Sequence, residues 1–115
     1  MDYELRRIRG ERPKYPEHSA ESFPAAPVPG DVREWDRLRK QFIALLTEFG
    51  ELTQSSAHEL QREIESGHDG DKKVAGTLEA VLWQMVAHNS YHTGQIAMIR
   101  RMLGAWPPRG GGDTW

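Results

Sequence analysis

The sequence predicts an all-α protein made of two long helices, a short helix and a helix stub at the N-terminus. Residues 31–55 and 77–103 place apolar side chains at alternating spacings of three and four, which is typical of helices that pack along one seam. Prolines and glycines separate the helical stretches. We find no strand pattern and no internal repeat, so the prediction contains helices only.

Composition limits the chain to a small domain and excludes several kinds of site. The 115 residues are expected to form a single domain, 1–115, whose apolar residues share one core. Lys and Arg number 15 against 17 Asp and Glu, and the net charge of -2 argues against nucleic acid or an anionic membrane as a partner. Cysteine is absent, which excludes disulfides, thiolate ligands and a cysteine nucleophile. The longest apolar run is far shorter than the roughly 20 residues that span a bilayer, and we expect a soluble, cytoplasmic protein.

Residues 1–10 are predicted to be the end of a helix. Met1, Leu5 and Ile8 fall on one helical face, and Gly10 followed by Pro13 is a typical helix stop. The pattern has no N-cap and no room for a first turn, so we expect this helix to begin upstream of Met1. A frayed terminal helix is the alternative.

Residues 11–30 are predicted to be a connector, because five prolines prevent both a continuous helix and a central strand. These prolines are Pro13, Pro16, Pro24, Pro27 and Pro29. The favoured interpretation is a stiff crossover between helices. The alternative is a polyproline ligand for an aromatic groove.

The long helix over 31–55 opens with a capping pattern, in which Asp31 is followed three residues later by Glu34. Its seam contains Trp35, Leu38, Phe42, Leu45, Phe49 and Leu52. Ser56 and Glu59 repeat the capping pattern and predict a short helix over 56–66. The glycine-rich, charged residues 67–76 then predict a turn.

The long helix over 77–103 has Thr77 as its predicted N-cap, and Gly104 followed by Pro107 ends it. Its seam contains Leu78, Leu82, Met85, Asn89, His92, Ile96, Ile99 and Leu103. Residues 104–115 are expected to form a flexible tail in which Trp106 folds back onto the last turn.

His88 and His92 are the candidate metal ligands. Four residues apart on a helix, their side chains project from the same face about 5 to 6 Å apart, and both can reach one ion at about 2.0 to 2.1 Å. Two ligands do not complete a site, so a third ligand must come from another helix. The alternative is a pair of core histidines whose polar atoms are satisfied by neighbours such as Asn89 and Gln95.

None of the residues next to the two histidines is identified as a general base. Asn89 follows His88, so the His-Glu-x-x-His pattern of metalloproteases is absent. Tyr91 and Gln95 are either support or substrate groups of the site, or Tyr91 lies on an outer face. Catalytic residues therefore stay unknown at this point.

The stretch HNSYHTGQIAMIRRMLGAWPP resembles the last-helix motif of the DinB and YfiT-like superfamily. In that motif His-x-x-x-His precedes x-Gly-Gln-Ile, an arginine, a glycine and prolines. The positions in register are His88, His92, Gly94, Gln95, Ile96, Arg100, Gly104 and Pro107. TLEAVLWQMVAH is similar to the approach to this motif, and EWDRLRKQF is similar to the third helix of the family.

The resemblance implies a four-helix bundle that holds a divalent metal, Ni, Zn or Fe, with His88 and His92 as two of its ligands. The family's third histidine lies on the second helix, and DYELRRIRGE resembles the end of that helix. We therefore expect a domain that lacks its first helix and part of its second. Three explanations for the missing histidine are open, in order of preference. The start codon is placed too late, the chain is naturally truncated, or another histidine replaces the missing ligand. The candidates for that replacement are His18, His58 and His68.

For function, the resemblance implies a metal-dependent enzyme, either a thiol S-transferase acting with a low-molecular-weight thiol or a hydrolase of a small-molecule substrate. Thiol transfer is favoured because the motif helix offers no base besides the ligands. A missing first helix leaves apolar seams uncovered, so we also expect a homodimer. The alternative is a non-enzymatic bundle fragment that dimerises and binds no metal.

Overall fold

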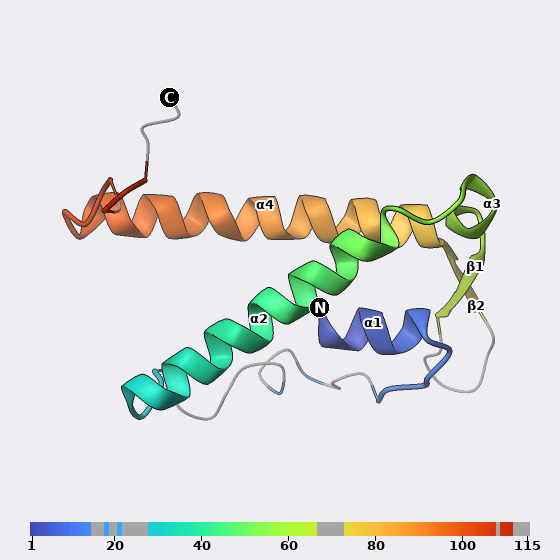
Figure 1. The fold of residues 1–115 in the computed structure, drawn as a ribbon, viewed down its shortest axis with the longest axis horizontal. Helices are drawn as coiled ribbons and strands as arrows, with labels where there is room; N and C mark the ends of the chain where they lie inside the picture. Colours follow the sequence, from blue (N-terminus) through green and yellow to red (C-terminus); the bar gives the residue numbers. More distant parts are fainter. Residues whose placement is uncertain (15–17, 19–20, 22–27, 67–72, 108, 112–115) are drawn as a thin grey trace. The chain divides into compact units, whose positions relative to one another are not determined.

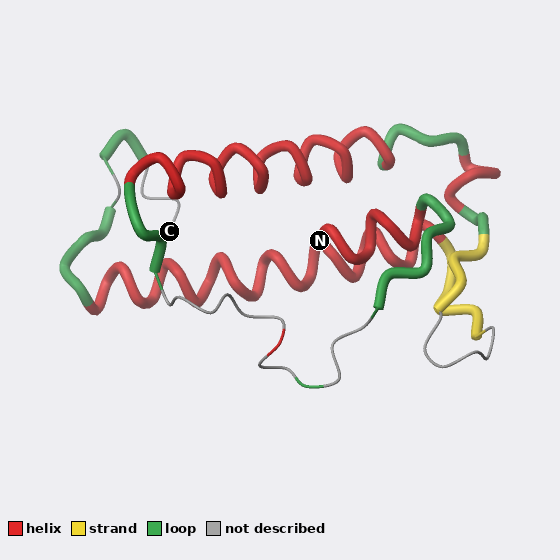
Figure 2. Tube along the Cα trace, turned by 90° about the horizontal axis from the view of Figure 1, so that it is seen from below, coloured by secondary structure: helices red, strands yellow, loops and turns green. Residues whose placement is uncertain are grey.

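The computed structural model describes residues 1–14, 18, 21, 28–66, 73–107 and 109–111 of the chain. The described residues form four helices and two strands (Figures 1 and 2). In chain order these are α1 (Asp2–Ile8), α2 (Val32–Leu52), α3 (Ala57–Leu60), β1 (Glu63–Ser66), β2 (Lys73–Thr77) and α4 (Leu78–Met102). The predicted all-α class is confirmed, with a small hairpin added to it.

The chain divides into two compact units, Met1–Leu82 and Trp83–Trp115. The first unit contains α1, α2, α3, the hairpin and the first residues of α4. The second contains the rest of α4 and the residues that follow it. None of the described helices is both long and apolar enough to cross a membrane.

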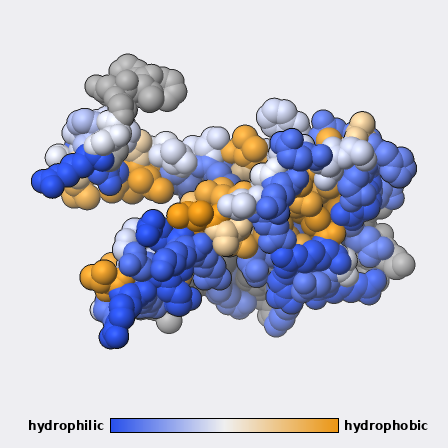
Figure 3. All heavy atoms as spheres, in the orientation of Figure 1, coloured by the Kyte–Doolittle hydropathy of each residue, from blue (hydrophilic) through white to orange (hydrophobic). Residues whose placement is uncertain are grey.

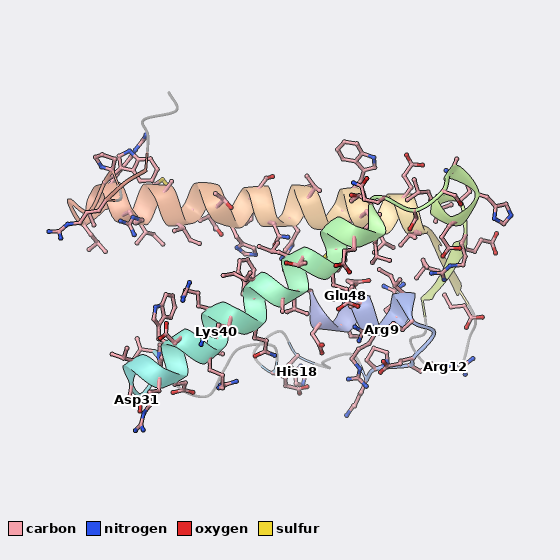
Figure 4. All side chains as sticks on the ribbon, in the orientation of Figure 1. Arg9, Arg12, His18, Asp31, Lys40 and Glu48 are labelled. Atoms are coloured by element: carbon pink, nitrogen blue, oxygen red, sulfur yellow. The ribbon has the colours of Figure 1, made fainter. Side chains whose placement is uncertain are left out.

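The ends of α1 and α2 follow the predicted capping signals. Asp31, at the start of α2 (Figure 4), accepts a hydrogen bond from the backbone N–H of Glu34 at 2.7 Å. The Glu34 carboxylate in turn accepts from the backbone N–H of Gly30 at 2.7 Å, so two donors at the helix start are satisfied. At the end of α1, Gly10 has a φ of 82°, a left-handed conformation that suits glycine and closes the helix.

The prediction of a helix over 56–66 is correct only in its first turn. Ser56 caps α3 by accepting from the N–H of Glu59 at 3.2 Å, but the helix ends at Leu60. The segment Glu63–Ser66 is instead strand β1, paired antiparallel with β2. Ile64 is the one apolar residue of β1 and is buried, which fits the inward position of an alternating strand.

Strand β2 also corrects the prediction that 67–76 is a turn throughout. Lys73, Val74 and Gly76 have partners in β1, whereas residues 67–72 lie outside the described part. The register shifts between Ile64 and Glu65, opposite Gly76, whose φ is 126°. This bulge needs a residue that tolerates a positive φ. Gly76, which belongs to the predicted turn, therefore lies inside a strand.

The apolar core of the first unit draws its residues from α1, α2, β1 and the start of α4. The buried side chains there are Leu5, Ile8, Phe49, Ile64, Leu78, Val81 and Leu82. The seam predicted for α2 contributes less than expected, because Phe49 is its one buried member among the described residues. Trp35, Leu38 and Phe42 are exposed.

Polar contacts also hold the elements of the first unit together. Arg9, directly after α1, forms an ion pair with Glu48 of α2, and the two side chains point toward one another in Figure 4. The Arg62 guanidinium donates from Nη2 to the backbone oxygen of Ile8 at 3.2 Å. These contacts tie the end of α1 to α2 and to the segment between α3 and β1.

Helix α4 begins and ends as predicted. The Thr77 hydroxyl accepts from the N–H of Ala80 at 3.3 Å, and Gly104, with a φ of 65°, ends the helix. Trp106 folds back as expected, with the Arg101 guanidinium 5.1 Å from its ring centroid. Arg100 donates to the backbone oxygen of Ala105 at 2.8 Å, so it satisfies a carbonyl beyond the helix end.

The connector predicted over 11–30 is only partly described. Residues 15–17, 19–20 and 22–27 lie outside the described part, and they include Pro16, Pro24 and Pro27. Pro13 and Pro29 are described and belong to neither an α-helix nor a strand. The polyproline geometry stays a prediction.

Candidate metal centre

Helix α4 brings the two candidate ligands together. His88 and His92 lie one turn apart, and their Nε2 atoms are 3.0 Å from each other. The ring centroids are 4.5 Å apart and the ring planes meet at 76°. The two Nε2 atoms therefore face each other across one helical turn.

The other ring nitrogen of His92 contacts a second side chain of the same helix. His92 Nδ1 lies 2.9 Å from Oε1 of Gln95, and the Gln95 amide donates from Nε2 to the Tyr91 hydroxyl at 3.0 Å. The Tyr91 and His92 rings also meet edge to face, with centroids 5.4 Å apart. Tyr91 is exposed, as its outer-face alternative expects, and it still joins Gln95 and the histidines in one network of contacts.

The predicted buried seam of α4 extends only to Met85. Leu78, Leu82 and Met85 are buried, whereas Ile96, Ile99 and Leu103 are exposed. His88 and His92 are also exposed, so they lie beside the buried stretch rather than within it. Figure 3 shows apolar side chains among polar ones on α4. Because Trp83, Val86 and Met98 lie off the seam, the apolar residues of this helix cover more than one face.

A third ligand is not assigned. His18 is an exposed residue of the connector, His58 lies on α3, and His68 falls outside the described residues. His18 and His58 belong to the unit Met1–Leu82, whereas His88 and His92 belong to the other unit. Within the described part of the chain, no three His, Asp or Glu side chains gather into a group that holds a metal.

The geometry of the pair fits one transition-metal ion. Imidazole nitrogens bind such ions at about 2.0 to 2.1 Å, so two nitrogens 3.0 Å apart are near enough for both to reach one ion. Neutral imidazole suits Zn, Ni and Fe, and the absence of cysteine from the chain leaves nitrogen and oxygen as the ligand atoms.

Comparison with protein-family models identifies the chain. The model of the DinB family matches residues 30–110, which is more than half of the sequence. The chain belongs to the DinB family. The matched region of this DinB-family protein begins just before α2 and includes all of α4, so both candidate ligands lie inside it. No curated protein and no solved structure matches the chain significantly.

The DinB-family match agrees with the resemblance drawn from the motif residues, and the structure adds what the motif does not contain. Sequence spacing pointed to His88 and His92 as a pair, but it left the role of Tyr91 open. The sequence does contain the helical spacings that bring these side chains together. Tyr91 and Gln95 are four residues apart, and Gln95 follows His92 by three. Only the side-chain positions show that these two spacings form one connected chain of hydrogen bonds.

Proposed function

We propose that this DinB-family protein binds one divalent transition-metal ion through Nε2 of His88 and Nε2 of His92. The observation that supports it is the 3.0 Å separation of these two atoms, which suits two adjacent ligands of one ion. The family is also generally associated with metals. The family resemblance implies Ni, Zn or Fe, and imidazole ligands suit all three.

We further propose that the protein is a metal-dependent transferase that acts on a low-molecular-weight thiol. When bound, the ion would supply Lewis-acid chemistry, which ionises a coordinated thiol outright. Helix α4 carries no Asp or Glu after Glu79, so no carboxylate of the helix stands near the histidines in sequence to accept a proton from water. A thiol has an ordinary pKa of about 8.5, far below that of water, and needs no such base.

The chain's own residues would then have two tasks. His88 and His92 hold the ion at a fixed point on α4, and the exposed position of both rings leaves room for an incoming small molecule. Both imidazoles are occupied as ligands in this arrangement, so neither serves as the proton acceptor of the reaction. Hydrolysis would require a base from outside α4.

The metal proposal is tested by elemental analysis of the protein purified without a histidine tag. We expect close to one Zn, Ni or Fe per chain in the parent, and loss of that metal in the His88→Ala, His92→Ala double variant. Gln84→Ala is the matched control, because Gln84 is an exposed residue one turn before His88. Circular dichroism of all three proteins checks that helix content is retained.

Two results would overturn the proposal. A parent protein that holds no metal, even after incubation with Zn²⁺ or Ni²⁺, would make the histidine pair a feature of a non-catalytic helical protein. A double variant that keeps its metal would place the ligands elsewhere.

The thiol proposal has its own readout. After exchange with Co²⁺, addition of 2-mercaptoethanol or free cysteine should produce a thiolate-to-cobalt charge-transfer band that the double variant lacks. A cobalt-loaded parent whose spectrum is unchanged by thiols would rule out thiol transfer while leaving metal binding intact.

A further inference from the structure

We infer that Gln95, held by Tyr91, is a positioning residue that fixes His92 in the tautomer with its proton on Nδ1. The inference concerns the metal-free protein, and it rests on the proposed metal site only where it predicts an affinity. It gives a role to two side chains that no ligand assignment uses.

The hydrogen bonds define the direction of each proton. An amide oxygen is an acceptor only, so the 2.9 Å contact between Gln95 Oε1 and His92 Nδ1 requires a proton on Nδ1. The amide is oriented in turn by Tyr91, because its Nε2 donates to the Tyr91 hydroxyl at 3.0 Å. In this orientation of the amide, Nε2 faces the Tyr91 hydroxyl and Oε1 faces Nδ1 of His92.

The consequence for the second nitrogen follows from the chemistry of imidazole. A neutral ring has one N–H and one lone pair, so a proton on Nδ1 of His92 leaves a lone pair on its Nε2. This is the nitrogen that lies 3.0 Å from His88. Gln95 therefore prepares His92 as a ligand before any ion arrives, in the manner of the carbonyl groups that orient metal-binding histidines.

The same argument assigns the opposite tautomer to His88 in the metal-free protein. Two lone pairs do not face each other at 3.0 Å, so the His88 Nε2 carries the proton that closes the contact. For both Nε2 atoms to serve as ligands, His88 would have to carry its proton on Nδ1 instead. His88 would then change tautomer, whereas His92 would keep its own.

The test reads the tautomers directly, by long-range ¹H–¹⁵N NMR of the metal-free protein in alkaline buffer. We expect His92 to show a protonated Nδ1 and an unprotonated Nε2, and His88 to show the reverse. Zn²⁺ should convert His88 to the His92 pattern. A parent in which His92 carries its proton on Nε2 would overturn the inference, because the amide would then be turned the other way.

Variants separate positioning from general structure. Gln95→Leu removes the acceptor, so His92 should become a mixture of tautomers and the Zn²⁺ affinity should fall by about 10- to 100-fold, as for other residues that orient metal-binding histidines. Gln95→Glu keeps an acceptor oxygen and should restore the parent tautomer. Tyr91→Phe removes the group that orients the amide and should give a smaller effect in the same direction. Gln84→Leu, the same substitution elsewhere on α4, should leave both readouts unchanged.

The outcomes distinguish this inference from the proposed function. If the tautomers are as stated but no ion binds, the metal site fails and the positioning role stands. If metal binds but Gln95→Leu changes neither the His92 tautomer nor the affinity, the positioning role fails and the metal site stands.

Discussion

The guanidinium group of Arg7 donates two hydrogen bonds to one backbone oxygen, that of Glu65, from Nε at 3.1 Å and from Nη2 at 3.0 Å. The two residues are 58 positions apart in the chain, on α1 and on β1. The remaining nitrogen, Nη1, pairs with Glu4 at 2.7 Å, and only 10% of the Arg7 side chain is exposed. One side chain therefore joins the first helix to the hairpin.

Replacement of Arg7 by Met should destabilise the protein by about 1 to 3 kcal/mol, because it leaves the Glu65 carbonyl and the Glu4 carboxylate without their donor. Lysine should not restore the loss, since its ammonium group cannot reproduce the planar fork. The measurement is urea unfolding followed by circular dichroism. Arg6→Met is the control, because the Arg6 to Glu11 ion pair is exposed and contributes little to stability. Equal losses in both variants would contradict a specific role for Arg7.

Truncation of Leu5 tests whether α1 belongs to the folded core. Its side chain is 1% exposed, so Leu5→Ala should cost about 2 to 5 kcal/mol from lost burial and the cavity left behind. Leu38→Ala makes the same chemical change at an exposed position of α2 and should cost clearly less. Chemical unfolding of the two variants side by side gives the comparison. A Leu5→Ala variant as stable as the parent would show that α1 is dispensable for folding.

The sequence predicts the two long helices of this fold well because their ends are encoded locally. The side chains of Asp31 and Thr77 accept hydrogen bonds from backbone N–H groups three residues later, and Gly104 ends α4. Each signal involves only neighbouring residues, so it can be recognised without the rest of the chain. Strand β1 is different. It has a single apolar residue, Ile64, and its structure depends on pairing with a segment farther along the chain, which no local pattern records.

The candidate site also has one part that the sequence predicts and one part that it does not. The spacing of His88 and His92 predicts that their side chains share one helical face, and the structure confirms it. The direction of each ring and the contact between Gln95 and Tyr91 depend on side-chain rotamers. Rotamers are set by neighbours in space, so the sequence could name these residues but not their roles.

The cap at Asp31 offers a third stability test. Asp31→Ala removes the acceptor that holds the N–H of Glu34 at 2.7 Å and should cost about 1 kcal/mol. Asp36→Ala is the matched control, because Asp36 lies inside α2 and its pair with Arg39 at 3.5 Å is exposed. That control should change stability by no more than about 0.5 kcal/mol. A larger loss at Asp36 than at Asp31 would contradict the capping role.

Metal binding should also be visible as stability. A ligand that binds only the folded state stabilises it by about 2.7 kcal/mol at a concentration of 100 times its Kd, so Zn²⁺ should raise the Tm of the parent and a chelator should reverse the rise. The effect should vanish in the His88→Ala, His92→Ala variant and persist in Gln84→Ala. Thermal unfolding with and without Zn²⁺ makes the measurement. An equal rise in the double variant would mean that Zn²⁺ binds elsewhere on the folded chain, and a lower Tm in the parent would mean that the ion prefers the unfolded state.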